Sequence, residues 1–380
     1  MDEQKIWAHS GDSHFIEPED LFNQILPPAL AKRMPWSEKV SDHEEIVHID
    51  GKEFRRPLPK IATKKINGVS MSELSSRPPG ARDIRARLAD LDQEGIWAEV
   101  VYSSLGMWDQ NLTDVALVKA AAAAQNEWRI KEVQGVAPDR LIAVAALPLL
   151  DVEASVQEAK HAAELGFKAI GMPAPGLPNS STYNHSITPL NDDAWEPLWA
   201  FMEEAGLVAA FHIGGDAGEH TVYRGPGGAV LNYTNSTFSG QRAAMLMVAS
   251  GALDRHPDLK VLISEAGATW VPFLGERMNE GYRQHGMFVR PTLSRSPKEI
   301  LFDQVYASFQ HEDIAIAAMM HMGYDKVMFG SDYPHLEGTY GHTQKTLHEL
   351  VDDAPADVRY RVTQGAFKEL FPHVSDPPAS

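Results

Sequence analysis

The sequence contains no cysteine among its 380 residues. This absence excludes a disulfide framework, a thiolate zinc site, an iron–sulfur cluster and a cysteine nucleophile. Any metal ion would therefore be bound by nitrogen and oxygen ligands. Basic residues are also scarce, because 34 Lys and Arg stand against 52 Asp and Glu and the net charge is −18. This balance argues against a nucleic-acid-binding protein, which usually presents a basic face.

Long hydrophobic runs are absent as well. The longest apolar run, residues 141–150, is about half of the roughly 20 residues that a membrane-spanning helix needs. The first residues are acidic, and no basic patch precedes an apolar stretch, so we expect no secretory signal and a cytoplasmic protein. A hydrophobic content of 43% is that of a folded chain, and its partner is expected to be a small molecule rather than nucleic acid or a membrane.

The sequence does contain a repeated alternation of short apolar runs and amphipathic stretches. Eight apolar runs are expected to be strands: residues 6–10, 96–103, 141–149, 167–172, 207–212, 259–265, 300–308 and 326–331. Stretches of helical period lie between them: residues 81–94, 112–133, 151–165, 192–205, 241–254, 312–322 and 343–351. Strands that alternate with helices pair in parallel through right-handed crossovers. Eight such units predict an α/β protein with a closed (β/α)₈ TIM-like barrel.

The main alternative is an open, doubly wound sheet, which usually has a glycine-rich phosphate-binding turn after its first strand. Here the first strand leads into Asp12, Ser13 and His14 without such glycines, which favours the barrel. Insertions interrupt the pattern after strands 1 and 5, at residues 15–80 and 214–236, where barrel loops form the rim of an active site. We expect one barrel domain over residues 1–374 and a flexible tail over residues 375–380.

Polar side chains stand at the ends of the otherwise apolar strands. Asp12 and His14 follow the first strand, and His212, Glu265 and Asp332 lie at the ends of the fifth, sixth and eighth. Each of them, taken singly, has an ordinary explanation as a turn, a cap or a core histidine. In a barrel, however, these strand ends converge on one mouth. Their imidazole and carboxylate groups form a ligand set suited to Zn²⁺, Mn²⁺ or Fe²⁺, with one or two ions per chain.

The segments that carry these residues resemble the amidohydrolase superfamily, and within it the amidohydrolase-2 branch, which is like aminocarboxymuconate semialdehyde decarboxylase. They are residues 11–18 (Gly-Asp-Ser-His-Phe-Ile-Glu-Pro), 211–215 (Phe-His-Ile-Gly-Gly), 255–260, 270–278 and 329–335 (Phe-Gly-Ser-Asp-Tyr-Pro-His). The resemblance covers nearly the whole chain. It implies that Asp12, His14 and His212 are metal ligands and that Asp332 is both a ligand and the proton-transfer group. It also implies a homo-oligomer, a dimer or larger, although a hetero-oligomer stays open.

One departure from the family concerns the end of the sixth strand. Decarboxylases of this branch usually carry a histidine there, whereas this chain has Ser264, Glu265, Ala266 and Gly267. The loss of an imidazole removes a group that titrates near neutral pH and adds an anion. Glu265 is therefore a candidate metal ligand and catalytic residue, and its alternative role is to cap the strand or to support His212.

Three further residues are candidates for the site. Glu17 is either a metal ligand or a cap for the helix that Pro18 would begin. His335 lies three residues after Asp332 and is either a substrate-binding residue or part of an ordinary turn. Arg224, in the second insertion, is a candidate for binding a substrate carboxylate.

These residues allow three functions. The first is a divalent-metal-dependent hydrolase or non-oxidative decarboxylase that acts on a small organic acid or amide. The second is a dinuclear oxygenase of the iron or iron–manganese type, because the carboxylate-rich set offers enough ligands for two ions. The third is a non-catalytic subunit of a hetero-oligomer that retains a structural ion. The sequence leaves the substrate, the metal and the reaction type open.

Overall fold

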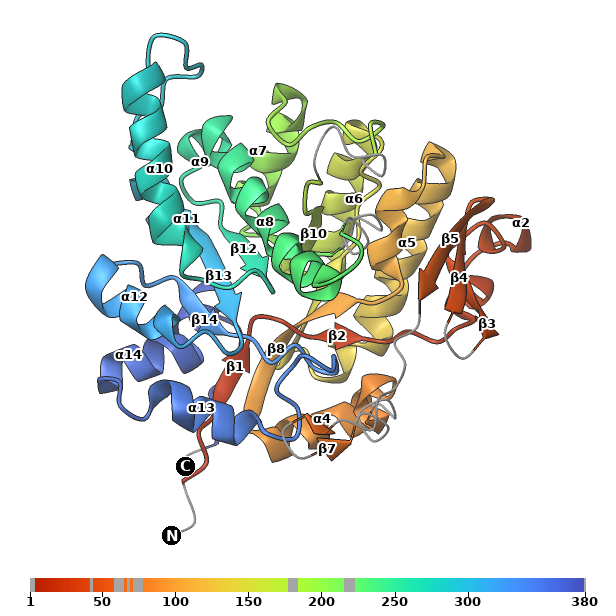
Figure 1. Cartoon of the computed structure of the whole chain (residues 1–380). Coiled ribbons are helices and arrows are strands. Elements are labelled where there is room, and N and C mark those ends of the chain that lie inside the picture. Colours follow the sequence, from red (N-terminus) through yellow and green to blue (C-terminus); the bar gives the residue numbers. More distant parts are fainter. Residues whose placement is uncertain are drawn as a thin grey trace.

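The computed structural model describes residues 4–41, 44–57, 65–66, 69–70, 78–176, 184–214 and 223–378. Eight strands form its centre: β1 (Ala8–Ser10), β8 (Ile96–Ser103), β9 (Leu141–Ala145), β10 (Ala169–Pro173), β11 (Val208–His212), β12 (Val261–Ser264), β13 (Val305–Phe309) and β14 (Val327–Phe329). Neighbours in this order pair in parallel. The first and last strands also meet, because Gly11 N donates to Phe329 O at 2.8 Å and Ser13 pairs with Tyr333. The predicted barrel is confirmed (Figure 1).

Helices surround the barrel, and all of those named here except α10 and α11 overlap a stretch that the sequence pattern predicts to be helical (Figure 1). They are α4 (Ile84–Glu94), α5 (Val115–Glu132), α6 (Val152–Leu165), α7 (Glu196–Glu204), α8 (Gly228–Ala249), α10 (Trp270–His285), α11 (Pro297–Gln304), α12 (Ile314–Met322) and α13 (Thr343–Val351). Aspartates begin three of them, because the side chains of Asp83, Asp114 and Asp151 accept hydrogen bonds from first-turn backbone N–H groups.

Two apolar layers hold this arrangement together. One lies between the strands and the surrounding helices and includes Phe167, Trp199 and Phe211. The other fills the barrel and joins inward-facing residues such as Tyr306 to Phe367 and its neighbours in α15 (Ala366–Leu370). The C-terminal helix α15 therefore closes one end of the barrel and leaves the other end for the site.

The first insertion contains an unexpected antiparallel sheet of β3 (Trp36–Ser41), β4 (Glu44–Ile49) and β5 (Lys52–Pro57), beside α5 in Figure 1. The short helices α1 (Leu21–Ile25) and α2 (Pro28–Ala31) precede it, and the pair β6 (Lys65–Ile66) and β7 (Val69–Ser70) follows it. The sequence shows little periodicity here because every residue of β3 is exposed, so its two faces do not alternate. The rest of the insertion, at residues 42–43, 58–64, 67–68 and 71–77, lies outside the described residues.

The inserted sheet shares an apolar cluster with the helical layer of the barrel. Met34, Val47 and Ile49 pack with Leu117 and Val118 of α5. On this ground we retain the proposal that residues 1–374 form one domain. In the proposed tail, Ser375 accepts a hydrogen bond from Trp97 Nε1 at 3.0 Å, and residues 379–380 lie outside the described part.

Two expectations from the sequence are wrong. The strand predicted over residues 300–308 begins only at Val305, because Ser296 and Glu299 form a capping box that starts α11. The helix predicted from residue 241 begins at Gly228, so the predicted loop 214–236 is helical in its last part, and its residues 215–222 lie outside the described chain. Two other elements differ in extent or were not foreseen: α9 (Ala252–Arg255) is separate from α8, and α10 was not anticipated.

Among the described residues, no helix combines the length and apolar composition needed to cross a membrane.

Candidate metal centre

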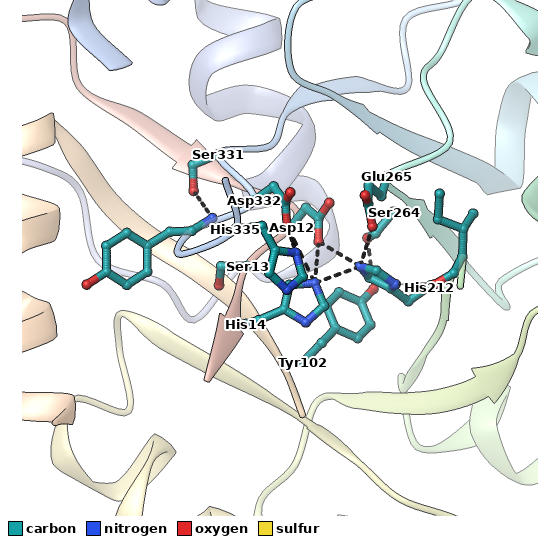
Figure 2. Close-up of polar contacts among 12 residues, drawn as sticks. Asp12, Ser13, His14, Tyr102, His212, Ser264, Glu265, Ser331, Asp332 and His335 are labelled. Carbon is teal, nitrogen blue, oxygen red and sulfur yellow. Dashed lines mark hydrogen bonds and ion pairs between the residues drawn. The ribbon is translucent and has the colours of Figure 1, made fainter. Parts of the chain in front are cut away.

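The polar residues that the sequence places at strand ends meet at one mouth of the barrel. Asp12 follows β1, His14 begins the short strand β2 (His14–Phe15), and His212 is the last residue of β11. Glu265 and Asp332 follow β12 and β14. Figure 2 shows these side chains pointing toward one another from separate strands, with His335 beside them. The convergence that the barrel prediction implied is therefore present in the structure.

Asp12, His14 and His212 form one group of potential ligands, whose ligand atoms all lie within 4.8 Å of one another. The Nε2 atoms of the two histidines are 2.9 Å apart. Asp12 Oδ1 lies 3.3 Å from His212 Nε2 and 3.9 Å from His14 Nε2. All three residues are buried.

Glu265, Asp332 and His335 complete a second group that shares His14. Asp332 Oδ1 lies 3.6 Å from His14 Nε2 and 2.8 Å from His335 Nδ1. The ring of His335 stacks on that of His14, with centroids 4.1 Å apart. Glu265 Oε2 reaches His212 Nε2 at 3.3 Å. The two groups thus share His14, and their potential ligand atoms face the same space at the barrel mouth.

The orientation of His212 is determined by its neighbours. Its Nδ1 lies 2.6 Å from the carbonyl oxygen of Ile213, so Nδ1 carries the proton and Nε2 presents a lone pair to the site. The ring of Tyr102 packs against His212 with centroids 4.8 Å apart. The Tyr102 hydroxyl hydrogen-bonds Ser264 Oγ at 2.8 Å, and Ser264 Oγ donates to Gly11 O at 2.8 Å.

Tyr102 and Ser264 were not identified from the sequence as parts of the site. The signal that could have found them is the one used for the ligands, because both lie at the ends of barrel strands, in β8 and β12. Tyr102, however, is aromatic and lies within an apolar run, so the sequence pattern predicts that it is a core residue.

The charges of the site shift the pKa values of its members. Burial lowers the pKa of His212, but the charges of Asp12 and Glu265 outweigh it and the net direction is upward. Burial and the charge of Asp332 raise the pKa of Glu265 well above its usual range.

The donor set fits a divalent cation. Both carboxylate oxygens of Asp12 are buried and have no hydrogen-bond donor among the residues that the structure describes. Three carboxylates lie close together in a region where isolated charge is costly, and a cation would compensate them. Two imidazole nitrogens together with carboxylate oxygens are ligands that zinc, manganese and iron accept.

Two of the candidate residues do not join this centre. Glu17 is buried, but its carboxylate accepts hydrogen bonds from Ser103 Oγ and from the backbone N–H groups of Ser104 and Leu105 at 3.1 and 3.0 Å. It therefore holds the loop after β8, a role that the sequence did not suggest, and it does not cap a helix, because α1 begins only at Leu21. Arg224 is exposed, and neither group of potential ligands includes it.

A cavity of about 100 Å³ adjoins the centre and shares His212 and Tyr102 with it. Its wall also includes the polar side chains of Ser103, Asp109 and Arg129. Apolar residues of β9, β10 and the loop after β9 form much of the rest, among them Val144, Leu147 and Met172. A mostly apolar cleft with a few polar groups beside a metal centre is typical of a small-molecule site.

Comparison with known sequences identifies a matching protein family and several similar enzymes. The amidohydrolase family model matches residues 78–370. γ-Resorcylate decarboxylase of Rhodococcus jostii is 27% identical over 209 residues, which cover 52% of this chain and 61% of that enzyme. 2-Amino-3-carboxymuconate-6-semialdehyde decarboxylase of Dictyostelium discoideum is 27% identical over 335 residues, which cover 83% of this chain and 81% of that enzyme. The first match thus spans less than two thirds of its relative.

Comparison with solved structures shows the same fold. An amidohydrolase from Mycobacterium avium subsp. paratuberculosis superimposes with a TM-score of 0.76 at 21% identity, covering 97% of this chain and 99% of that one. A dihydroxybenzoic acid decarboxylase from Polaromonas, solved with bound manganese and the inhibitor 2-nitroresorcinol, gives a TM-score of 0.65 at 16% identity and covers 98% of both chains.

Proposed function

Because this chain belongs to the amidohydrolase family, we propose that it is a metal-dependent, non-oxidative decarboxylase that releases CO₂ from a hydroxylated aromatic acid. The observation that carries the proposal is the convergence of Asp12, His14, His212 and Asp332 at one barrel mouth beside a cavity. The two sequence relatives named above are decarboxylases, which favours carbon–carbon bond cleavage over hydrolysis.

The family match confirms the family that the sequence resembles, and with it the expectation of an amidohydrolase-type enzyme. None of the relatives named above is an oxygenase, so the dinuclear oxygenase alternative is not supported. Nor do they favour a non-catalytic subunit, because they are enzymes.

We propose that Asp12, His14, His212 and Asp332 hold one manganese ion, the metal bound in the Polaromonas enzyme. Glu265 and His335 are the residues of the second group that would extend the site to a second ion. A bound divalent cation polarises the carboxylate and hydroxyl oxygens that it contacts. Zinc and iron remain alternatives that metal analysis of the purified protein distinguishes. A cytoplasmic homo-oligomer remains the prediction from the sequence.

Asp332 is proposed to supply the proton for the reaction. It gives a proton to the ring carbon that bears the carboxylate, the bond from that carbon to the carboxylate breaks, its electron pair restores the aromatic ring, and CO₂ leaves. His335 Nδ1, at 2.8 Å from Asp332 Oδ1, is placed to return a proton to Asp332. Glu265 occupies the sixth-strand position where decarboxylases of this branch usually carry a histidine, and its Oε2 lies 3.3 Å from His212 Nε2, so it is proposed to hold His212 in place.

The test is CO₂ release from 2,6-dihydroxybenzoate and related hydroxybenzoates by the manganese-loaded protein. We expect Asp332→Asn to lower kcat by about 10²–10⁴-fold, the usual contribution of a general acid. Asp313→Asn, at an exposed position, is the matched control and should keep the wild-type rate. Metal analysis of each variant reports whether the ion is retained. Wild-type turnover by Asp332→Asn would remove this residue from proton transfer, and failure of every acid to release CO₂ would overturn the proposed reaction.

A further inference from the structure

The cavity beside the metal centre contains polar groups that the proposed reaction does not use. Asp109, from the 3₁₀ helix η2 (Gly106–Asn111), and Arg129, from α5, both line it together with His212. Arg129 is only 6% exposed. These residues lie far from Asp12 and Asp332 in the sequence, and nothing in the reaction step requires them.

Arg129 begins a series of hydrogen bonds. Because its guanidinium can only donate, it determines which atom is the donor in each of the bonds that follow. Its Nη1 donates to Val144 O at 3.1 Å, and its Nη2 donates to Gln125 Oε1 at 2.6 Å. An arginine cannot accept, so the Gln125 amide must present its oxygen to Arg129. Its nitrogen Nε2 then donates to Asp109 Oδ2 at 2.5 Å. A Cβ at Gly106 would clash with Arg129 Nη2, so glycine is what allows the loop to pass so closely.

This series of hydrogen bonds ends at an oxygen for which the described residues provide no partner. Asp109 Oδ1 is buried and makes no hydrogen bond with any part of the chain that the structure describes. A buried polar atom without a partner costs about 1–3 kcal/mol, and such atoms in native proteins call for an explanation. Because Asp109 lines the cavity, a ligand in the cavity is the group able to satisfy it.

The charges around Asp109 define which ligand group suits it. Burial raises the pKa of Asp109 to about 7, against the opposing effects of the Gln125 hydrogen bond and the Arg129 charge, and the charge of Glu17 adds to the increase. Asp109 therefore exists in both the protonated and the ionised form near neutral pH. A hydroxyl group accepts a hydrogen bond from the first form and donates one to the second, so it pairs with both.

We propose that Asp109 is a specificity residue, and that its Oδ1 hydrogen-bonds a second ring hydroxyl of the aromatic acid, in addition to a first hydroxyl next to the reacting carboxylate. The assignment rests on the proposed function, because it takes the acid to be held at one end by the metal centre and to extend into the cavity. The substrate class is thereby narrowed to aromatic acids with at least two hydroxyl groups.

The test compares ligands that differ by one hydroxyl. The manganese-loaded wild-type protein is titrated calorimetrically with salicylate and with 2,3-, 2,4-, 2,5- and 2,6-dihydroxybenzoate. We expect at least one dihydroxybenzoate to bind about tenfold more tightly than salicylate, which corresponds to one hydrogen bond to a buried group. In Asp109→Leu this preference should disappear while the affinity for salicylate stays at the wild-type value. Thermal unfolding of each variant shows whether it is folded.

Asp109→Asn is the matched variant, because it keeps the size of the side chain and can keep the bond from Gln125. With its amide nitrogen in place of Oδ1 it can only donate to the hydroxyl. Retention of the preference in Asp109→Asn supports a donating Asp109, and loss in both variants supports an accepting one. A preference that persists in Asp109→Leu, or the absence of any preference in the wild type, overturns the assignment. If no acid binds at all, the proposed function fails and the assignment fails with it.

Discussion

Glu265 and Asp332 adopt a backbone conformation that few residues with a side chain adopt. Their φ angles are 60° and 51°, in the left-handed region that usually favours glycine. Such conformations cost on the order of 1–3 kcal/mol and persist where the surrounding structure imposes them, often at functional sites. Here Glu265 directly follows β12, Asp332 lies three residues after β14, and both carboxylates reach a histidine of the site.

His9 is a buried histidine on the closed side of the barrel, away from the metal centre. Its ring packs on Phe367 with centroids 5.0 Å apart, and neither ring nitrogen has a hydrogen-bond partner in the described structure. Burial, reinforced by the charge of Lys368, lowers the pKa of His9 from 6.5 to about 3. The unfolded chain therefore binds a proton that the folded chain does not as the pH falls from 6.5 toward 3.

This linkage predicts that His9 makes the fold sensitive to acid. Above pH 6.5 the protonation of His9 takes nothing from the free energy of unfolding. At pH 5 it should have lowered that free energy by about 2 kcal/mol. His9→Leu should remove that part of the loss. Urea unfolding at pH 7 and pH 5 measures it, with the exposed His321→Leu as the control. An equal loss of stability in the wild type and in His9→Leu would contradict the prediction.

At the scale of elements, α4 connects three segments of the barrel through one side chain. Arg87 is fully buried and pairs with Glu99 of β8. Its Nη1 donates to His14 O in β2 at 2.7 Å, and its guanidinium lies 4.5 Å from the ring centroid of Tyr333, next to Asp332. Arg87 is therefore a positioning residue for the two segments that carry metal ligands.

Arg87→Gln should affect stability and metal binding together. It leaves Glu99 buried without its partner, which costs about 3–5 kcal/mol in comparable pairs. We also expect about a tenfold loss of manganese affinity, because residues that orient ligands usually contribute 10–100-fold. Unfolding and metal titration measure the two effects, with the exposed Arg85→Gln on the same helix as the control. A stability loss with unchanged manganese affinity would limit Arg87 to a structural role.

For the whole molecule, the helix α15 decides which end of the barrel is open. Phe367 and Leu370 of α15, with Phe371 after it, pack against inward-facing residues of the strands, including Ala98 and Tyr306. The segment that leads into β1 lies on this side as well, because Gln364 Nε2, just before α15, donates to Trp7 O at 3.1 Å. The core inside the barrel is therefore completed by the last part of the sequence.

Phe367→Ala should destabilise the whole barrel. Phe367 is 1% exposed, and truncation of a buried phenylalanine costs about 3–5 kcal/mol through lost burial and the cavity that remains. The exposed Phe288→Ala removes the same atoms from a side chain that is 78% exposed and should change stability little. Equal midpoints in urea for wild type and Phe367→Ala would show that α15 is not needed to complete the core.

Local patterns in the sequence were sufficient to predict the alternation of strands and helices, the barrel and the residues at its mouth. These follow from local patterns, because a strand buried on both faces must be apolar and a polar residue at its end stands out. Asp12, His14, His212, Glu265 and Asp332 were recognisable for this reason. The inserted sheet was not, since its exposed first strand has no alternating pattern.

Which of the candidate residues meet depends on how the elements pack in three dimensions. Glu17 resembles a ligand in the sequence, but the last residue of β8 and the loop after it supply three donors that hold it away from the metal centre. Asp109 has no distinguishing pattern, and its role depends on a hydrogen-bond chain through Gln125 and Arg129 of another element. Distances between residues remote in sequence result from packing of the whole barrel, and local patterns do not encode them.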